Sequence, residues 1–131
     1  MTVPLPQAEV EIATLAYTAP DRVEVRFKPG VEFTSARIAE LMQVRAKLGV
    51  SGKHRVLMIL PEVIDFDVDI VQVEHYTVTP QPNTEAVAWL VRSAEDMHIT
   101  RLAVGRGVPT FPWKVFMNEA EARAWLEEVV P

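Results

Sequence analysis

Three aspartates that alternate with apolar residues form the group in this chain whose spacing comes closest to that of a binding site. Asp65, Asp67 and Asp69 occupy every second position. Acidic residues in this alternation open the EF-hand loop, where their oxygens coordinate calcium. That loop also needs glycine at its sixth position and glutamate at its twelfth, where this chain has Ile70 and Tyr76. We therefore predict a solvated acidic segment and no metal ligands. A metal-dependent enzyme that uses these carboxylates is the third of the functions we consider.

Basic and aromatic residues form a second candidate group in the segment 106–113. Proline at 109 and 112 stiffens this segment, and an exposed aromatic side chain beside an arginine is typical of an anchor for a partner or ligand. Aromatic side chains more often supply core area, so core packing is the favoured interpretation here. The candidate contact residues for a ligand or partner are Arg106, Phe111, Trp113, Asp65 and Asp67.

The histidines, Ser93 and the glycines at 105 and 107 do not follow the spacing of a known catalytic or phosphate-binding motif. The three histidines, His54, His75 and His98, have no second histidine three or four residues away, as a helical zinc site would require. Ser93 lacks the flanking glycines of a nucleophile elbow and is better explained as a helix cap. The pair of glycines at 105 and 107 follows a predicted helix, whereas phosphate loops precede one. The sequence predicts no catalytic residue and no cofactor.

Composition narrows the class of protein further. The 131 residues are 49% hydrophobic and 24% charged, which predicts one globular domain. The chain has no cysteine, and its net charge is −5 with dispersed lysines and arginines, which argues against a nucleic-acid partner. Apolar runs of about six residues fall short of the roughly 20 that span a bilayer. Residues 1–9 lack the pattern of a signal peptide, so we expect a cytoplasmic protein.

Hydrophobic periodicity predicts an α/β domain in the order β-β-α-β-α-β-α-β-α, after a loose lead-in over residues 1–8. Strands are expected over 10–17, 22–28, 56–60, 86–92 and 113–117, and helices over 35–48, 67–75, 94–104 and 118–130. The segment 62–80 fits both a strand and a helix; the helix is favoured because carboxylates at a helix start meet the positive end of its dipole. Arg45 interrupts an apolar helical stripe, and Gly49 and Gly105 are expected to end helices. This order predicts a mixed sheet with helices packed on it.

The C-terminal third of the sequence carries a family resemblance. A hydrophobic strand that ends in Ser93 is followed by a short helix that ends in Leu-Ala-Val-Gly. A Pro-aromatic loop then leads to a strand that ends in Val115-Phe116. After this strand comes the sequence Asn-Glu-Ala-Glu-Ala-x-Ala-Trp-Leu. This pattern resembles bacterial STAS-like proteins, which are related to sporulation anti-sigma-factor antagonists. The resemblance implies one STAS-like domain over 1–131 and a non-enzymatic regulatory role. Such antagonists carry a serine or threonine that becomes phosphorylated in kinase switches. The matching region here is 61–67, which contains neither residue, so no phosphorylation site is carried over.

The predicted α/β fold and the STAS-like resemblance suggest two binding functions. The first is protein–protein contact, including self-association as a homodimer. The second is binding of a small apolar ligand or lipid, because STAS-like sheets resemble lipid-binding folds and the loop 108–113 could gate a pocket between helix and sheet. The second rests on fold analogy.

Overall fold

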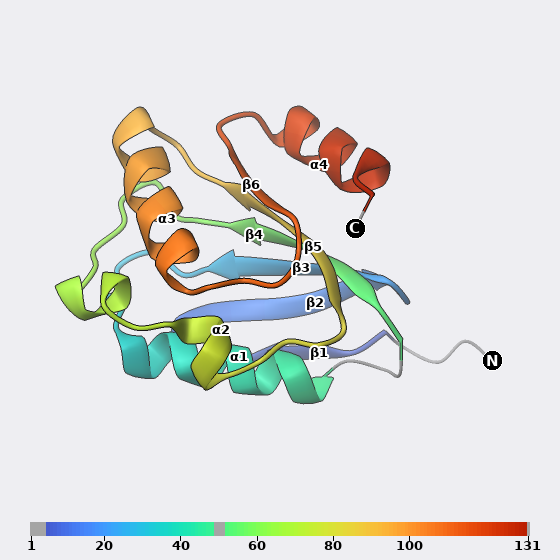
Figure 1. Cartoon of the computed structure of the whole chain (residues 1–131), viewed down its shortest axis with the longest axis horizontal. Coiled ribbons are helices and arrows are strands. Elements are labelled where there is room, and N and C mark those ends of the chain that lie inside the picture. Colours follow the sequence, from blue (N-terminus) through green and yellow to red (C-terminus); the bar gives the residue numbers. More distant parts are fainter. Residues whose placement is uncertain (1–4, 49–51, 131) are drawn as a thin grey trace.

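Six strands form one mixed sheet in which their order in space follows their order in the chain (Figure 1). The computed structural model describes residues 5–48 and 52–130. The strands are β1 (Gln7–Glu9), β2 (Ala13–Ala19), β3 (Arg22–Phe27), β4 (His54–Ile59), β5 (Thr84–Leu90) and β6 (Trp113–Phe116). The first three strands pair antiparallel, and the pairs from β3 to β6 are parallel. The predicted mixed α/β sheet is therefore confirmed, with one more strand than expected.

The extra strand corrects the expected N-terminal lead-in. Residues 7–9 pair with β2, with Ala8 opposite Leu15, and Ala8 packs against the core. The first strand expected over 10–17 lies three residues later, because the Val10 amide donates to the Ala13 carbonyl at 2.9 Å and forms a turn. The hairpin of β2 and β3 has the expected single wet face: Val23 and Val25 are buried, and Arg26 is exposed.

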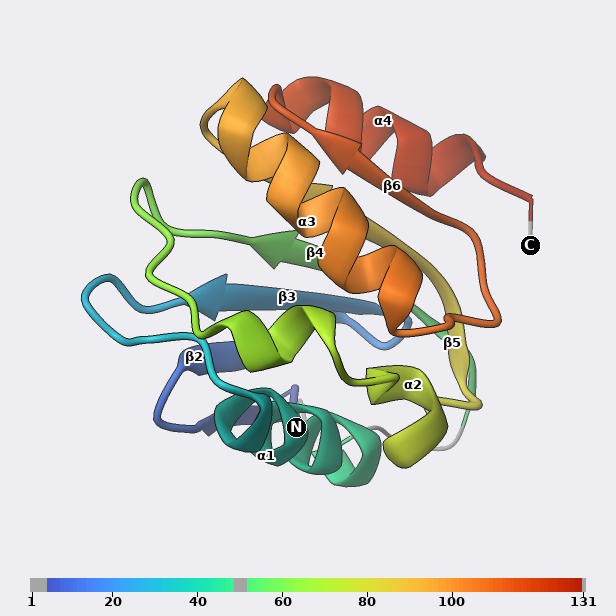
Figure 2. The same ribbon diagram turned by 60° about the vertical axis from the view of Figure 1, so that its left-hand side comes forward.

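Helices cover the two faces of the sheet unequally. One face carries α1 (Ser35–Leu48), the 3-10 turn η1 (Val68–Val71), α2 (His75–Val78) and α3 (Ala94–Arg106); the other carries α4 (Glu119–Glu128). Right-handed connections between successive parallel strands place the intervening helices on one face. Figure 2 shows η1 and α2 between α1 and α3, in front of the strands.

The two helical layers differ in the size of the side chains beneath them. Ala86, Ala88 and Ala122 are fully buried between α4 and the sheet, and their small side chains let the helix approach the strands closely. On the opposite face, β4 and β5 present Met58 and Trp89. These longer side chains hold α1 and α3 farther from the strands, and the apolar cavity described below lies in this thicker layer.

The segment between β4 and β5 is the main error in the predicted secondary structure. In place of one helix from 67 to 75, it contains η1 and α2, each of four residues. The Asp67 side chain caps η1 by accepting from the Asp69 amide at 3.1 Å. The Gln72 amide then donates to the Asp69 carbonyl, and this bond ends η1 after a single helical turn. The local capping therefore ends this helical turn before a longer helix can form.

The other helix boundaries agree closely with the sequence. Ser93 and Asn118 cap α3 and α4 as expected, accepting amides three residues on at 3.1 and 3.0 Å. Gly105 does not end α3, as was expected; the helix continues to Arg106, and the Gly107 amide donates back to the Ala103 and Val104 carbonyls. The stop expected at Gly49 lies outside the described residues.

Replacing Asn118 by alanine is expected to lower the free energy of unfolding by about 1 kcal/mol, because the amide of Glu121 loses its side-chain acceptor. Asn118→Asp is the matched control: it keeps an acceptor and adds a charge that suits the N-terminal end of α4. Urea denaturation followed by circular dichroism measures both. Equal losses in the two variants would show that the cap contributes nothing.

Candidate functional site

The aromatic and basic candidate group does not form a common surface. Phe111 is only 8% exposed, and its ring packs edge-on against Tyr76 with the centroids 5.0 Å apart. Trp113 is half-buried and Arg106 is exposed. Phe111 is therefore a core residue that joins the loop before β6 to α2, and it offers no aromatic anchor to a partner.

The acidic candidate group has structural partners. The Asp69 carboxylate accepts from the Ser35 amide at the start of α1, at 3.3 Å and 3.4 Å. Asp65 accepts the Phe33 amide through its backbone carbonyl at 2.6 Å, and Asp67 caps η1. Within residues 5–48 and 52–130, no three histidine or carboxylate side chains gather as metal ligands would. The acidic segment serves to tie η1 to the first turn of α1.

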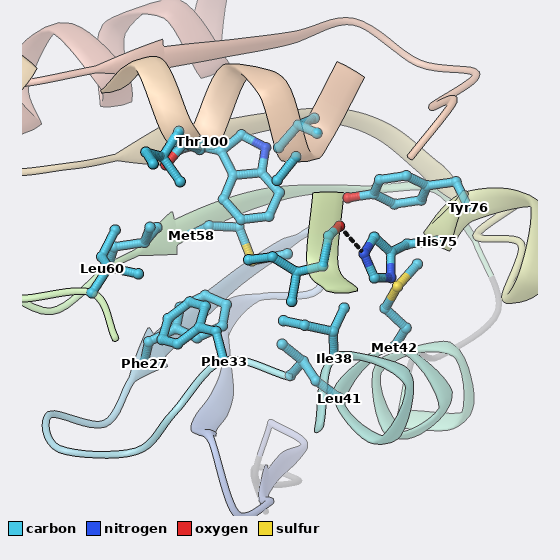
Figure 3. A pocket seen from close by; sticks show the side chains of 16 residues that line it. Phe27, Phe33, Ile38, Leu41, Met42, Met58, Leu60, His75, Tyr76 and Thr100 are labelled. Atoms are coloured by element: carbon cyan, nitrogen blue, oxygen red, sulfur yellow. Dashed lines mark hydrogen bonds between the residues drawn. The ribbon is translucent and has the colours of Figure 1, made fainter. Parts of the chain in front are cut away.

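An apolar cavity lies between the sheet and the helical layer of α1, η1, α2 and α3 (Figure 3). Its volume is about 70 Å³. Each surrounding element contributes side chains to its wall, among them Phe27, Leu41, Met58, Ile70, Trp89 and Val104. Four wall residues bring polar atoms: Thr100, His75, Tyr76 and Trp89, whose buried indole Nε1 has no hydrogen-bond partner among the described residues. A space bounded by hydrophobic side chains with few polar groups is typical of a site for small apolar ligands.

Two of the polar wall residues, His75 and Tyr76, are held in place by contacts with neighbouring segments. His75 donates from Nε2 to the Ile70 carbonyl at 2.7 Å, which joins α2 to η1. The Tyr76 amide donates to the Gly107 carbonyl at 2.9 Å, and its ring lies so close to Gly107 that a Cβ there would be 3.0 Å from Cδ2. Figure 3 shows the Tyr76 hydroxyl directed inward. Burial raises the pKa of Tyr76, and the positive charge of Arg45 partly opposes that rise.

Arg45 is the most unusual polar residue of the domain. It is only 1% exposed, although it is an arginine on the sheet-facing side of α1. Its Nη1 donates to Thr84 Oγ1 at 2.9 Å and lies 3.2 Å from Nε2 of His54. Its Nε and Nη2 have no hydrogen-bond partner among the described residues, and neither has the nearby hydroxyl of Tyr17. Burial lowers the pKa of Arg45 from its usual value, and the two tyrosines partly oppose that change.

His54 completes this buried group as a neutral acceptor. Burial, followed by the charge of Arg45, lowers the pKa of His54 to about 4, whereas the Gly52 backbone and Glu85 act in the opposite direction. Since a guanidinium only donates, the Nε2 atom of a neutral His54 must be the acceptor of this bond. We call Arg45, His54, Thr84 and Tyr17 the Arg45 cluster; its members come from α1, β4, β5 and β2.

Sequence reasoning missed the Arg45 cluster. It expected a pocket between helix and sheet with the loop 108–113 as its gate, but no residue of that loop lines the cavity. Arg45 was taken as an interruption of the apolar stripe of α1, and the available signal was its spacing, four residues after Leu41 on the same face. For the cavity, the helical spacing of apolar residues around Ile70 was a signal, but the register of three strands and three helices decides which side chains meet.

Comparisons with known proteins add no identification. The sequence matches no protein-family model, and neither curated proteins nor solved structures gave a significant match. The STAS-like resemblance therefore stays a prediction. Within the described part of the chain, none of the helices has the length and apolar character needed to cross a membrane.

Proposed function

We propose that this domain is a non-catalytic binding protein that takes a small apolar molecule into the cavity between the sheet and the helices α1 and α3. The observation that carries the proposal is the cavity itself, a partly open apolar space between the sheet and the helical layer of α1, η1, α2 and α3. Apolar surface removed from water on both partners drives this kind of association, at about 25 cal/mol per Å². The side chains of Asp67 and Asp69 already accept backbone amides, and this structural role argues against the metal-dependent enzyme considered from the sequence.

The volume of the cavity limits the size of ligand that fits without a movement of the cavity wall. An engineered cavity of about 150 Å³ binds benzene, so about 70 Å³ holds only a few carbon atoms. A larger ligand requires the segment of η1 and α2 to move outward. This segment packs against α1 and α3 and is tied by backbone bonds at Phe33 and at Gly107. Between these two ties, the Asp69 carboxylate also accepts from the Ser35 amide, so an outward shift has to break that bond. Both helical pieces are four residues long, so few helical bonds oppose the shift.

Titration with straight-chain alcohols of about four to ten carbons tests the proposal. We expect saturable shifts of the amide NMR signals of cavity residues, with affinity rising along the series as each buried methylene contributes about 0.8 kcal/mol. Ala103 lines the cavity and Ala120 is exposed on α4, so Ala103→Phe should weaken binding at least tenfold and Ala120→Phe should leave it unchanged. No saturable shifts with any chain length, or equal effects of the two variants, would contradict the proposal.

Protein–protein contact, the function that the sequence favoured, is a second candidate with a different supporting observation. Helix α4 packs on β4, β5 and β6, while on the same side of the sheet Thr14 and Thr18 of β2 and Arg26 of β3 are exposed. We propose this polar half-face as the surface for self-association. Light scattering over a concentration series tests it: a constant monomer mass would exclude a homodimer in that range.

A further inference from the structure

We infer that the apolar ligand carries one acidic group, and that this group pairs with Arg45 behind the cavity wall. The inference rests on the proposed function and specifies its ligand class as a singly charged amphiphile. Its basis is the Arg45 cluster, which has buried donors without partners and lies beside the cavity.

The buried charge of Arg45 requires a counter-charge. Transferring a cation from water into a protein interior costs several kcal/mol, even after relaxation, unless an opposite charge and hydrogen bonds compensate. Within the described residues no carboxylate pairs with Arg45; its hydrogen-bond partners are the neutral side chains of Thr84 and His54. The C-terminal end of α1 supplies about half a negative charge, which offsets only part of the positive charge of Arg45.

The free donors match a group with two oxygens. Nε and Nη2 of a guanidinium lie side by side and bind a carboxylate through two parallel hydrogen bonds. On Arg45, Nε and Nη2 are the nitrogens without partners, and Nη1 already donates to Thr84. The unpartnered Tyr17 hydroxyl is a further donor in this cluster. Because His54 stays neutral at pH 7, the cluster holds a single positive charge, which fits a monoanion better than a dianion.

The position of Arg45 relative to the cavity allows one molecule to reach both. Leu41 lines the cavity from α1, and Arg45 follows it by one helical turn on the same face. Tyr76 lines the cavity as well, and the charge of Arg45 acts on its hydroxyl. An apolar chain in the cavity would therefore extend its acidic end past Tyr76 toward Arg45.

Matched acids and alcohols of equal chain length test the inference. We expect hexanoate to bind wild-type protein at least tenfold more tightly than hexan-1-ol at pH 7, as measured by NMR titration or calorimetry. In Arg45→Met this preference should vanish while hexan-1-ol binding persists; Arg45→Lys, which keeps the charge without the paired donors, should show an intermediate preference. Arg92 is exposed, and Arg92→Met, as a control for net charge, should retain the full preference.

The outcomes separate this inference from the proposed function. Equal affinity for acid and alcohol in wild-type protein would overturn the inference and leave apolar binding standing. A preference that survives in a folded Arg45→Met protein would overturn it as well, because the acidic group would then bind elsewhere. If neither compound binds at any chain length, the proposed function itself fails.

Discussion

Replacing Arg45 by methionine is expected to raise the free energy of unfolding of the ligand-free protein by about 1–4 kcal/mol. Methionine fills a similar volume, and the change removes a buried charge together with two unpartnered donors. The side chains that lose a bond, His54 and Thr84, are neutral, so no buried charge is left uncompensated. A stabilising substitution at a residue buried this deeply would indicate that the arginine is kept for binding at the expense of stability.

Arg45→Ala is the matched control for packing. It removes the same charge but leaves a hole, so it should be about 2–5 kcal/mol less stable than Arg45→Met, the usual cost of truncating a buried methionine-sized side chain. Urea denaturation of the three proteins at pH 7 gives the comparison. A loss of stability in Arg45→Met would show that the arginine holds the fold together, and that its buried charge is already compensated.

Acid is expected to destabilise the protein through His54 between pH 6.5 and 4. In the folded state burial and the charge of Arg45 hold the pKa of His54 near 4, whereas an unfolded histidine has a pKa of about 6.5. Between these values the unfolded chain binds the extra proton, so stability is present above pH 6.5 and is lost as the pH falls. The full difference between the two pKa values corresponds to about 3 kcal/mol; partial screening of the ring charge reduces the expected loss to about 2 kcal/mol.

Two variants isolate this contribution from the carboxylates that titrate in the same range. His54→Gln keeps an acceptor for Arg45 and cannot be charged, so its stability should fall about 2 kcal/mol less than that of wild type between pH 6.5 and 4. His98 is exposed, and His98→Gln should follow the wild-type curve. Thermal denaturation across this pH range gives the three curves; superimposable curves for His54→Gln and wild type would contradict the assignment.

Local patterns were enough to predict most of the elements, because each depends on residues close together in the chain. The alternation of Val23, Val25 and Phe27 predicts a half-buried strand, and Ser93 and Asn118 are cap residues whose partners lie three positions away. The apolar run from Val56 predicts a central strand, and β4 is indeed buried on both faces. The error over 62–80 arose because Asp67 caps a single helical turn there, and because Asp69 bonds to Ser35, a partner 34 residues away that periodicity does not reveal.

The site could not be predicted in the same way. The spacing of α1 places Arg45 in the apolar stripe, but its burial depends on β2, β4 and β5 meeting above it. Phe111 looked like a candidate for exposure because it lies in a proline-bearing loop, and it is buried because Tyr76 provides a ring for it to pack on. Features that need several distant segments, such as the cavity and the Arg45 cluster, appear only when the sheet is assembled.

The strand order β1-β2-β3-β4-β5-β6 also has a consequence for how the chain folds. Each strand pairs only with the strands before and after it in sequence, so no strand has to be inserted between two others. The opening hairpin can nucleate the sheet, and each later strand can join a growing edge as it leaves the ribosome. Keeping partners close in sequence lowers contact order compared with a sheet of permuted strands, which favours faster folding for a mixed α/β domain.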